Sequence, residues 1–549
     1  MNQNKELANL LFKDVTGTRE ELLEKFPPRN KVTTRFAPSP TGFLHIGGVY
    51  TSLICRKFAS QNNGVFFLRI EDTDKKREQE DSKDIILRCF NEFEIKIDEG
   101  VSFDETEIGN YGPYVQSKRI DIYHILAKYL VENGYAYPCF CTEEELNEIR
   151  DYQVKNKLTP GYYRSFAKYR DYDFDKVKEL IENNVPYTLR FRVPDDIEER
   201  IEFNDLIKGH IEMENNVNDF VLLKENGIPT YHFAHACDDT LMHTTNVIRG
   251  DEWLSSVPVH LQLFKALNFE RPEYAHVAPV MKQDGDSRRK LSKRKDPESS
   301  SEFYLQEGYP IKSIYVYLYT LINSNFEEWY LNNPDKDINE FEMSFENMSI
   351  SGALYDLTKL NSISSEILYK ENRETLLNNL LVYAEKYNPE LHTRLTSDLE
   401  FAKRLLNTQG ENSSEHRKDL SCYNDFLKVF GVFYDDVFEQ SHFTKEQLFE
   451  EGLLKPEEFE EVRTGFVKYF TEKKNGNENE ELNLKNLSKD LGFTDKKKYQ
   501  KNPELYKGVV FQFYKTLRLL LTHQEHGISI DDVIDVLGYD RAIERLLKY

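Results

Sequence analysis

The sequence lacks several features that would assign it to common classes of protein. No stretch of its 549 residues approaches the roughly 18 consecutive apolar residues of a membrane span, which indicates a soluble protein without a membrane partner. Only six cysteines occur, and the one close pair, Cys139 and Cys141, is too near in sequence for an easy disulfide. The first 30 residues have no apolar secretory core and are rich in acids, unlike transit peptides. We therefore expect a cytoplasmic protein.

Positive charge is also in short supply. The chain has 72 Lys+Arg against 95 Asp+Glu, a formal net charge of −23. Phosphate binding needs local positive potential, so the total charge by itself argues against nucleic acid as a partner. Net charge is a sum, however, whereas binding uses one face. The composition, 39% hydrophobic and 13% aromatic, excludes a disordered chain. At roughly 100–200 residues per domain, the length allows several domains.

The N-terminal half shows the pattern of a doubly wound sheet. Residues 32–36 alternate as in a strand, and a loop rich in proline and glycine follows at 38–42. A helix is predicted over 48–62, and residues 65–70 form an apolar run typical of a buried parallel strand. Strand, loop, helix and strand together make a βαβ unit.

The rest of the chain divides by pattern into an insertion and a helical region. The stretch before a further buried strand at 245–248 mixes helical and strand-like segments, and beyond about residue 300 the pattern becomes helical. The predicted fold class is therefore α/β, a doubly wound parallel sheet with an inserted α+β domain and an all-α C-terminal region. The predicted parts are a short helical N-terminal extension with Thr18 as a helix N-cap (1–30), the first half of the sheet domain (31–111), the insertion (112–230), the second half (231–270), a segment that contains a basic loop (271–365), and the helical region (366–549).

The first chemical motif is the string RFAPSPTGFLHIGG at residues 35–48. It forms a loop between the carboxyl end of a strand and the amino end of a helix, where doubly wound sheets bind phosphates. Gly47 and Gly48 allow a nucleotide to approach the backbone, and His45 can donate a hydrogen bond to a phosphate oxygen. His-x-Gly-Gly alone would fit an ordinary turn better, but the whole string favours a nucleotide site.

The second motif is KLSKR at residues 290–294, inside a segment with seven basic residues between 282 and 295. Only two acidic residues, Asp284 and Asp286, stand in the same segment. Gly285 and Ser287 favour a mobile loop. A flexible cationic loop can close over phosphates during their transfer. Taken alone, the segment would more simply be a solvated basic loop.

Together, the two motifs resemble the signatures of class I aminoacyl-tRNA synthetases. The string at 35–48, with LRIEDTD at 68–74 and VIRGDEWL at 247–254, is similar to bacterial-type glutamyl-tRNA synthetases, and GALYD at 352–356 resembles a further stretch of that family. The resemblance is dense over 31–365. It implies attachment of L-glutamate to tRNA(Glu) through a glutamyl-adenylate, with ATP and Mg²⁺ as co-substrates.

The resemblance also assigns functions to the parts of the chain. It implies that the insertion binds the acceptor end of tRNA, that residues 271–365 contact its stem, and that the helical region binds the anticodon. Glutaminyl enzymes, and glutamyl enzymes of archaea and eukaryotes, carry β-barrels in place of this helical region and usually have Pro where this chain has Ala37. We expect a monomer. Two alternatives stay open: an enzyme that also charges tRNA(Gln) with glutamate, and a non-catalytic tRNA-binding paralogue.

The expected substrate chemistry fits residues at the ends of predicted strands. Glutamate has two carboxylates and an ammonium group, so its site needs an arginine fork and an acid. Arg35 and Arg249 are placed for the carboxylates, in an order that stays open, and Glu71 is placed for the ammonium. Without the motifs, a structural ion pair would explain Arg249 and Glu71 somewhat better. By resemblance, Ala37, Ser39 and Tyr231 complete the glutamate site.

The resemblance places the ATP chemistry on the two motifs. His45, Gly47, Gly48 and Lys293 would bind ATP, and His45 and Lys293, supported by Lys290, would stabilise the transition state. The attacking group is the carboxylate of glutamate itself, so activation needs no general base from the protein, and catalysis rests on positioning and charge stabilisation.

We expect no metal site in the protein. Some family members hold zinc with a Cys-x-Cys pair and a second ligand pair about two dozen residues later. Here the pair is Cys139 and Cys141, and the corresponding stretch at 161–168 contains no Cys or His. Two thiolates alone do not make a tetrahedral zinc site.

Overall fold

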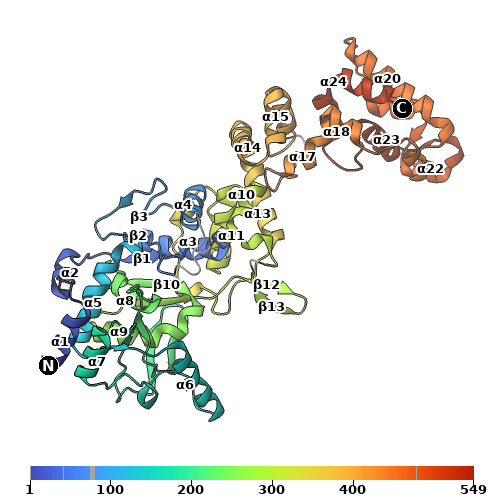
Figure 1. The fold of residues 1–549 in the computed structure, drawn as a ribbon. Helices are drawn as coiled ribbons and strands as arrows, with labels where there is room; N and C mark the ends of the chain where they lie inside the picture. The colour runs from blue at the N-terminus through green and yellow to red at the C-terminus, as the bar shows by residue number, and fades with distance from the viewer. Residues whose placement is uncertain are drawn as a thin grey trace. The chain divides into compact units, whose positions relative to one another are not determined.

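The computed structural model describes residues 2–40, 42–74, 81–292, 294–411, 413, 416–477 and 479–549. It divides into two compact units, which we describe separately. The sheet unit comprises Met1–Phe303 and Tyr315–Asp356, and the helical unit comprises Tyr304–Ile314 and Leu357–Tyr549 (Figure 1). Within the described residues, every helix is too short or too polar to span a bilayer.

Two sets of parallel strands, β3-β2-β1 and β10-β11, form the centre of the sheet unit and lie side by side at β1 and β10. The two halves meet where the Thr33 N–H donates to Thr245 Oγ1 at 2.8 Å and the Thr245 N–H donates to the Thr33 carbonyl at 3.0 Å. This arrangement confirms the predicted doubly wound parallel sheet. The bounds are β1 (Thr33–Phe36), β2 (Val65–Leu68), β3 (Glu99–Val101), β10 (Asn246–Gly250) and β11 (Glu273–Val277).

Helices follow the strands as the βαβ pattern requires. The first crossover helix, α3, connects β1 to β2 and begins at Ile46, two residues earlier than the sequence pattern indicated. Its buried residues include Leu53, Ile54 and Cys55. The other helices and outer strands of the sheet unit, outside the insertion and the N-terminal extension, are α4 (Ser82–Glu92), β4 (Glu107–Ile108), α8 (Tyr231–Leu241), α9 (Val257–Ala266), β12 (Met281–Asp284), β13 (Ser287–Lys290) and α12 (Phe326–Asn332), with α3 at Ile46–Gln61.

The segment predicted as an insertion contributes to two sheets. Strands β5, β6 and β9 form an antiparallel sheet of their own. The hairpin β7–β8 instead extends the parallel sheet, because Asp205 at the end of β7 pairs with Tyr274 of β11. The elements are α5 (Ile120–Glu132), β5 (Ala136–Cys139), α6 (Glu143–Lys155), α7 (Phe174–Glu182), β6 (Thr188–Phe191), β7 (Arg200–Asp205), β8 (Gly209–Glu214) and β9 (Val221–Leu223).

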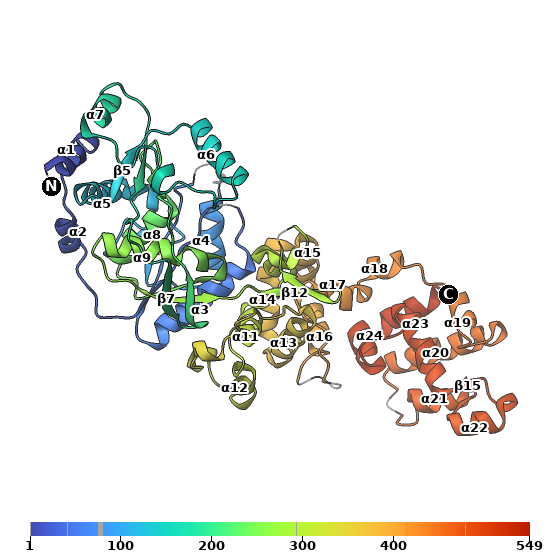
Figure 2. The same cartoon turned by 90° about the horizontal axis from the view of Figure 1, so that it is seen from below.

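The N-terminal extension packs against helix α5. Its two helices are α1 (Asn2–Leu11) and α2 (Arg19–Lys25), and Figure 2 shows both beside α5. Thr18 is the N-cap of α2: its hydroxyl accepts from the Glu21 N–H, and the Glu21 carboxylate accepts from the Thr18 N–H. Leu22 and Phe26 are buried in a cluster with Leu126 and other residues of α5.

The helical unit confirms the predicted all-α character, with one small exception. Phe493–Thr494 (β14) and Gly508–Val509 (β15) form a short parallel pair. The core of the helical unit is rich in leucine and phenylalanine from most of its helices. The helices are α13 (Leu357–Lys370), α14 (Arg373–Tyr387), α15 (Pro389–Ser397), α16 (Leu399–Asn407), α17 (Asp425–Phe430), α18 (Asp435–Gln440), α19 (Glu446–Glu450), α20 (Phe459–Lys474), α21 (Leu484–Asp490), α22 (Lys496–Lys501), α23 (Val510–Thr522) and α24 (Ile530–Leu547), while α10 (Ser301–Glu307) and α11 (Ile311–Ile322) include residues of both units.

We predict that the N-terminal extension stabilises the sheet unit through Phe26. The Phe26 side chain is 1% exposed, so Phe26→Ala should lower the free energy of unfolding by about 3–5 kcal/mol. Urea unfolding of the full chain measures the change. Phe103→Ala, at a position that is 57% exposed, is the control and should change stability by less than about 0.5 kcal/mol. Equal effects of the two substitutions would contradict a buttressing role.

Candidate active site

A cavity of about 600 Å³ lies beyond the carboxyl ends of β1, β2, β10 and β11. Open parallel sheets bind their ligands at this place, where the strand order reverses. Lys293 lies outside the described residues. The structure brings the other ten predicted site residues together, although their functional roles stay predictions. The ten that line the cavity are Arg35, Ala37, Ser39, His45, Gly47, Gly48, Glu71, Tyr231, Arg249 and Lys290.

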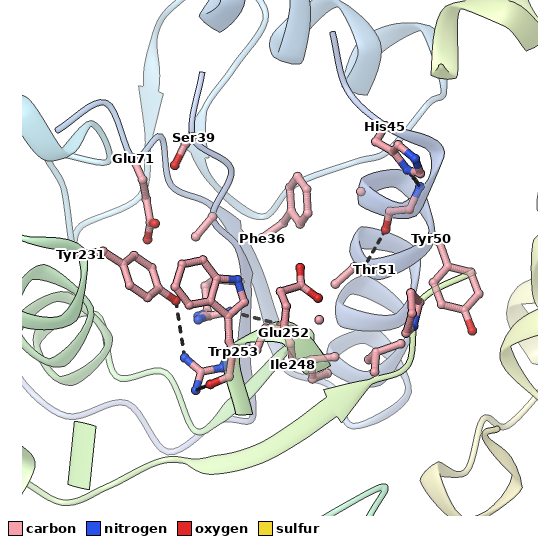
Figure 3. Close-up of a pocket in the computed structure, with 18 of the residues that line it drawn as sticks. Phe36, Ser39, His45, Tyr50, Thr51, Glu71, Tyr231, Ile248, Glu252 and Trp253 are labelled. Carbon is pink, nitrogen blue, oxygen red and sulfur yellow. Dashed lines mark hydrogen bonds between the residues drawn. The ribbon is translucent and has the colours of Figure 1, made fainter. Parts of the chain in front are cut away.

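One side of the cavity is formed by the amino end of α3 (Figure 3). His45 is the N-cap of this helix, and its Nδ1 accepts from the Gly47 N–H at 2.9 Å. In the neutral ring, the proton is therefore on Nε2, where it can be donated. A Cβ atom at Gly48 would lie 2.7 Å from Leu44 Cδ1, so the Leu44 side chain would have to shift to admit a larger residue there. Backbone N–H groups at a helix start favour an anionic ligand.

The opposite side of the cavity is built on a buried network of charges. Arg35 Nε donates to both carboxylate oxygens of Asp239 at 3.2 Å. Arg69 Nη1 donates to Asp239 at 2.7 Å, and Arg69 Nη2 donates to Glu71 Oε1 at 3.0 Å. His235 Nδ1 lies 2.8 Å from Asp239 Oδ2. Glu71 is thus held by an ion pair and also lines the cavity, so the two interpretations of this residue are compatible.

Burial and neighbouring positive charge shift the pKa values of the two carboxylates of this network, Asp239 and Glu71, in opposite directions. Burial alone would raise the pKa of Asp239, but Arg35, Arg69 and His235 hold it well below its usual value. Burial raises the pKa of Glu71 above its usual value, although Arg69 and Arg35 oppose the shift. An ammonium group beside Glu71 would stabilise its ionised form, because it would replace part of the lost solvation.

Arg249 is held differently from Arg35. Its guanidinium donates to His276 Nε2 at 3.1 Å, to the Trp253 carbonyl at 3.2 Å and to the Tyr231 hydroxyl at 3.4 Å. Within the described residues, no carboxylate lies within 4.0 Å of it, so it is not part of a structural ion pair. The ring of Tyr231 packs on Trp253 with centroids 4.1 Å apart (Figure 3).

The basic segment before KLSKR is a β-hairpin rather than a loop. Strands β12 and β13 pair in antiparallel fashion, with Gly285 at the turn in a left-handed conformation (φ 60°). Arg289 donates to Asp284 at 2.7 Å and to Asp296 at 2.8 Å. Lys282 is paired with Asp296 and Glu298. Two of the seven basic residues of the segment, Lys282 and Arg289, are therefore paired with two acids that lie just beyond it in sequence.

Lys290 keeps a position where it can meet a ligand. It ends strand β13, lines the cavity, and its ammonium lies 3.9 Å from Glu252 in an exposed ion pair. Exposed pairs of this kind contribute little energy and exchange readily. An anionic ligand could therefore compete for Lys290.

Cys139 and Cys141 share a hydrogen-bonding partner. Cys139 donates to the Tyr162 hydroxyl at 3.3 Å, and the same oxygen lies 3.4 Å from Cys141 Sγ. Among the described residues, no group of three or more Cys, His, Asp or Glu side chains could hold a metal ion. The absence of zinc stays a prediction, which metal analysis of the purified protein checks.

Sequence reasoning missed the residues that position the predicted ones. Arg69 stands inside the LRIEDTD string, which is the one signal that pointed near it. Asp239 and His235 lie on helix α8, and no motif marks them. Asp205 and His276 are 71 residues apart in sequence and meet only because β7 pairs with β11.

We predict that Asp239 stabilises the fold in a pH-dependent manner. Asp239→Asn leaves two buried arginines without their shared carboxylate and should cost about 3–5 kcal/mol at pH 7. Because the pKa of Asp239 is depressed, its contribution is fully present above the unfolded-state pKa of about 3.9, begins to decline below it, and is lost completely only when the pH has fallen through the lower folded-state pKa. Urea unfolding of the wild type and of Asp239→Asn at pH 7 and pH 3 measures the loss of stability and its decline at low pH. Asp335→Asn, at an exposed position, is the control. A loss below about 1 kcal/mol at pH 7 would contradict the prediction.

Comparison with known proteins agrees with this geometry. The family model for the catalytic domain of class I tRNA synthetases (E and Q) matches residues 31–361. A glutamate–tRNA ligase of Clostridium perfringens (strain SM101 / Type A) is 42% identical over 99% of both chains, and one of Clostridium beijerinckii is 41% identical over 99% of both. The crystal structure of a glutamate tRNA ligase from Elizabethkingia meningosepticum, in complex with its amino acid, superposes with a TM-score of 0.74 at 27% identity, over 94% of this chain and 99% of that one. The chain therefore belongs to the glutamate–tRNA ligases of the class I tRNA synthetase family.

Proposed function

We propose that this protein attaches glutamate to tRNA(Glu) in two steps, the first of which consumes ATP. The observation that carries the proposal is the single cavity lined by all ten described residues of the predicted site. The amino end of helix α3 and Lys290 offer positive potential to phosphates, and the Glu71 carboxylate and the Arg249 guanidinium offer complementary charges to an amino acid. Full-length relatives that are glutamate–tRNA ligases support the same reaction.

The first step forms a glutamyl-adenylate. The α-carboxylate of glutamate attacks the α-phosphate of Mg²⁺-bound ATP, a new O–P bond forms, and pyrophosphate leaves. The protein holds the two substrates in line and stabilises the charge that develops on the phosphates. His45 would donate through Nε2, and Lys290 and Lys293 would contribute positive charge.

The second step transfers glutamate to RNA. A ribose hydroxyl of the terminal adenosine attacks the activated carbonyl, an ester bond forms, and AMP leaves. In this proposal, the insertion receives the acceptor end of the tRNA, residues 271–365 contact its stem, and residues 366–549 read the anticodon. The enzyme would work as a monomer in the cytoplasm.

Charging of purified tRNA tests the proposed function directly. We expect the protein to load glutamate onto tRNA(Glu) and to leave tRNA(Gln) uncharged in a parallel assay. Loading of both tRNAs would indicate an enzyme that does not discriminate between them. The absence of any charging, together with tight tRNA binding, would indicate a non-catalytic paralogue.

We predict that Lys293→Ala removes most adenylate formation while glutamate binding survives. Loss of one charge-stabilising group at the reacting phosphates should slow activation by about 100-fold or more. Glutamate-dependent ATP–pyrophosphate exchange, with tRNA present, measures the rate. Lys295→Ala is the control, since it removes an equal charge two residues away. Near-normal exchange by Lys293→Ala would contradict the assignment.

A further inference from the structure

Three buried arginines lie in or beside the cavity, and one of them has no carboxylate partner among the described residues. Arg35 and Arg69 both donate to the carboxylate of Asp239, at 3.2 and 2.7 Å. Within the described residues, Arg249 has no carboxylate within 4.0 Å, although it is only 5% exposed. A buried guanidinium without a counter-ion is costly unless a ligand supplies one.

Neutral acceptors surround Arg249 instead. Its Nε donates to His276 Nε2 at 3.1 Å, and its Nη1 and Nη2 donate to His260 Nδ1 at 3.3 and 3.4 Å. The Trp253 carbonyl and the Tyr231 hydroxyl accept further hydrogen bonds at 3.2 and 3.4 Å. These contacts orient the guanidinium plane, yet none of them cancels its charge.

Both imidazoles are fixed as hydrogen-bond acceptors. Arginine only donates, so His276 Nε2 and His260 Nδ1 must carry no proton. The proton of His276 is then on Nδ1, 2.6 Å from Asp205 Oδ2, and the proton of His260 is on Nε2, 3.1 Å from His232 Nδ1. Each ring is thus locked in one tautomer by a partner on the side away from Arg249.

The Asp205 carboxylate is firmly placed behind His276. Its oxygens accept from the backbone N–H groups of Ile207, Lys208 and His276 at 2.9–3.3 Å. Asp205 therefore fixes the tautomer of His276 without contacting Arg249. The imidazole acts as a spacer that keeps a buried carboxylate from neutralising the arginine.

The surroundings keep both rings uncharged near neutral pH. Burial, aided by His235, Arg249 and His232, holds the pKa of His260 well below its usual value. Burial also lowers the pKa of His276; Arg249 and Lys208 act in the same direction, and Asp205 opposes them.

We infer that His276 and His260 form a neutral cradle that orients Arg249 and leaves its positive charge uncompensated, so that a carboxylate of the bound amino acid becomes its counter-ion. Asp205 and His232 are positioning residues, which act through the two imidazoles. The identity of that amino acid as glutamate rests on the proposed function.

Substitutions that change only the charge of the cradle test the inference. In D205N/H276Q and D205N/H276E, the residue at 276 can accept from Arg249 in both variants, but Glu adds a negative charge. The Asp205→Asn change in both avoids repulsion between two carboxylates. We expect the KM for glutamate to be at least tenfold higher in D205N/H276E than in D205N/H276Q, with KM for ATP equal within about twofold. Equal KM values for glutamate would overturn the cradle.

A second pair of variants, at His260, tests the other imidazole of the cradle. His260 lies on α9, and Asn or Asp places an oxygen near the position of its Nδ1. H260D should raise the KM for glutamate at least tenfold over H260N and leave the KM for ATP unchanged. Thermal unfolding without ligand identifies any variant that does not fold, and either pair decides the question by itself. A merely structural role would affect stability and both KM values together.

Stabilisation by L-glutamate separates this inference from the proposed function. The increase in Tm on adding glutamate reports binding without requiring adenylate formation. We expect a large increase for the wild type and the Gln and Asn variants and a small one for the Glu and Asp variants. Equal increases across each pair would refute the cradle, whereas a wild-type protein that is stabilised by glutamate but catalyses no exchange would refute the proposed function alone.

Discussion

The sheet unit depends on one buried carboxylate, that of Asp239. Arg35 and Arg69 leave neighbouring parallel strands at the same edge, and both direct their guanidinium groups to this residue. Two arginines so close together would repel each other without it, and the carboxylate would stay protonated without them. Glu71 is placed in turn by Arg69. One shared anion thus sets the positions of both an arginine and an acid that line the cavity.

The cavity uses two different ways of burying an arginine, and the difference has a chemical purpose. Arg35 is oriented by Asp239, a carboxylate that it shares with Arg69, so part of its charge is compensated before any ligand arrives. Arg249 is oriented by histidines, a hydroxyl and a carbonyl, which supply direction without compensation. The site therefore carries a positive charge at one defined point. A ligand with a carboxylate there gains an ion pair that a neutral ligand of the same shape does not.

The sequence predicted the fold class from local patterns, and it predicted ten described residues of the cavity lining from strand ends and motifs together with the resemblance to glutamyl-tRNA synthetases. Strand periodicity located β1 and β2, and residues such as Arg35 and Glu71 stand where those strands end. The supporting residues have no local signal: Asp205 and His276 become partners only through a strand pairing between distant segments. The charge of the basic segment was overestimated for a related reason. Asp296 lies one residue beyond the segment at 282–295, yet it binds Arg289.

The pairing of β7 with β11 means that the insertion is not a separable attachment to the catalytic sheet. Asp205 belongs to the segment between the two halves of that sheet, and it reaches His276 because the hairpin joins the sheet at Tyr274. Any movement of this hairpin relative to β11 would therefore change the hydrogen bond that holds the His276 tautomer, and through it the orientation of Arg249. A single strand pairing thus connects the segment proposed to receive the tRNA end with the charge proposed to select the amino acid.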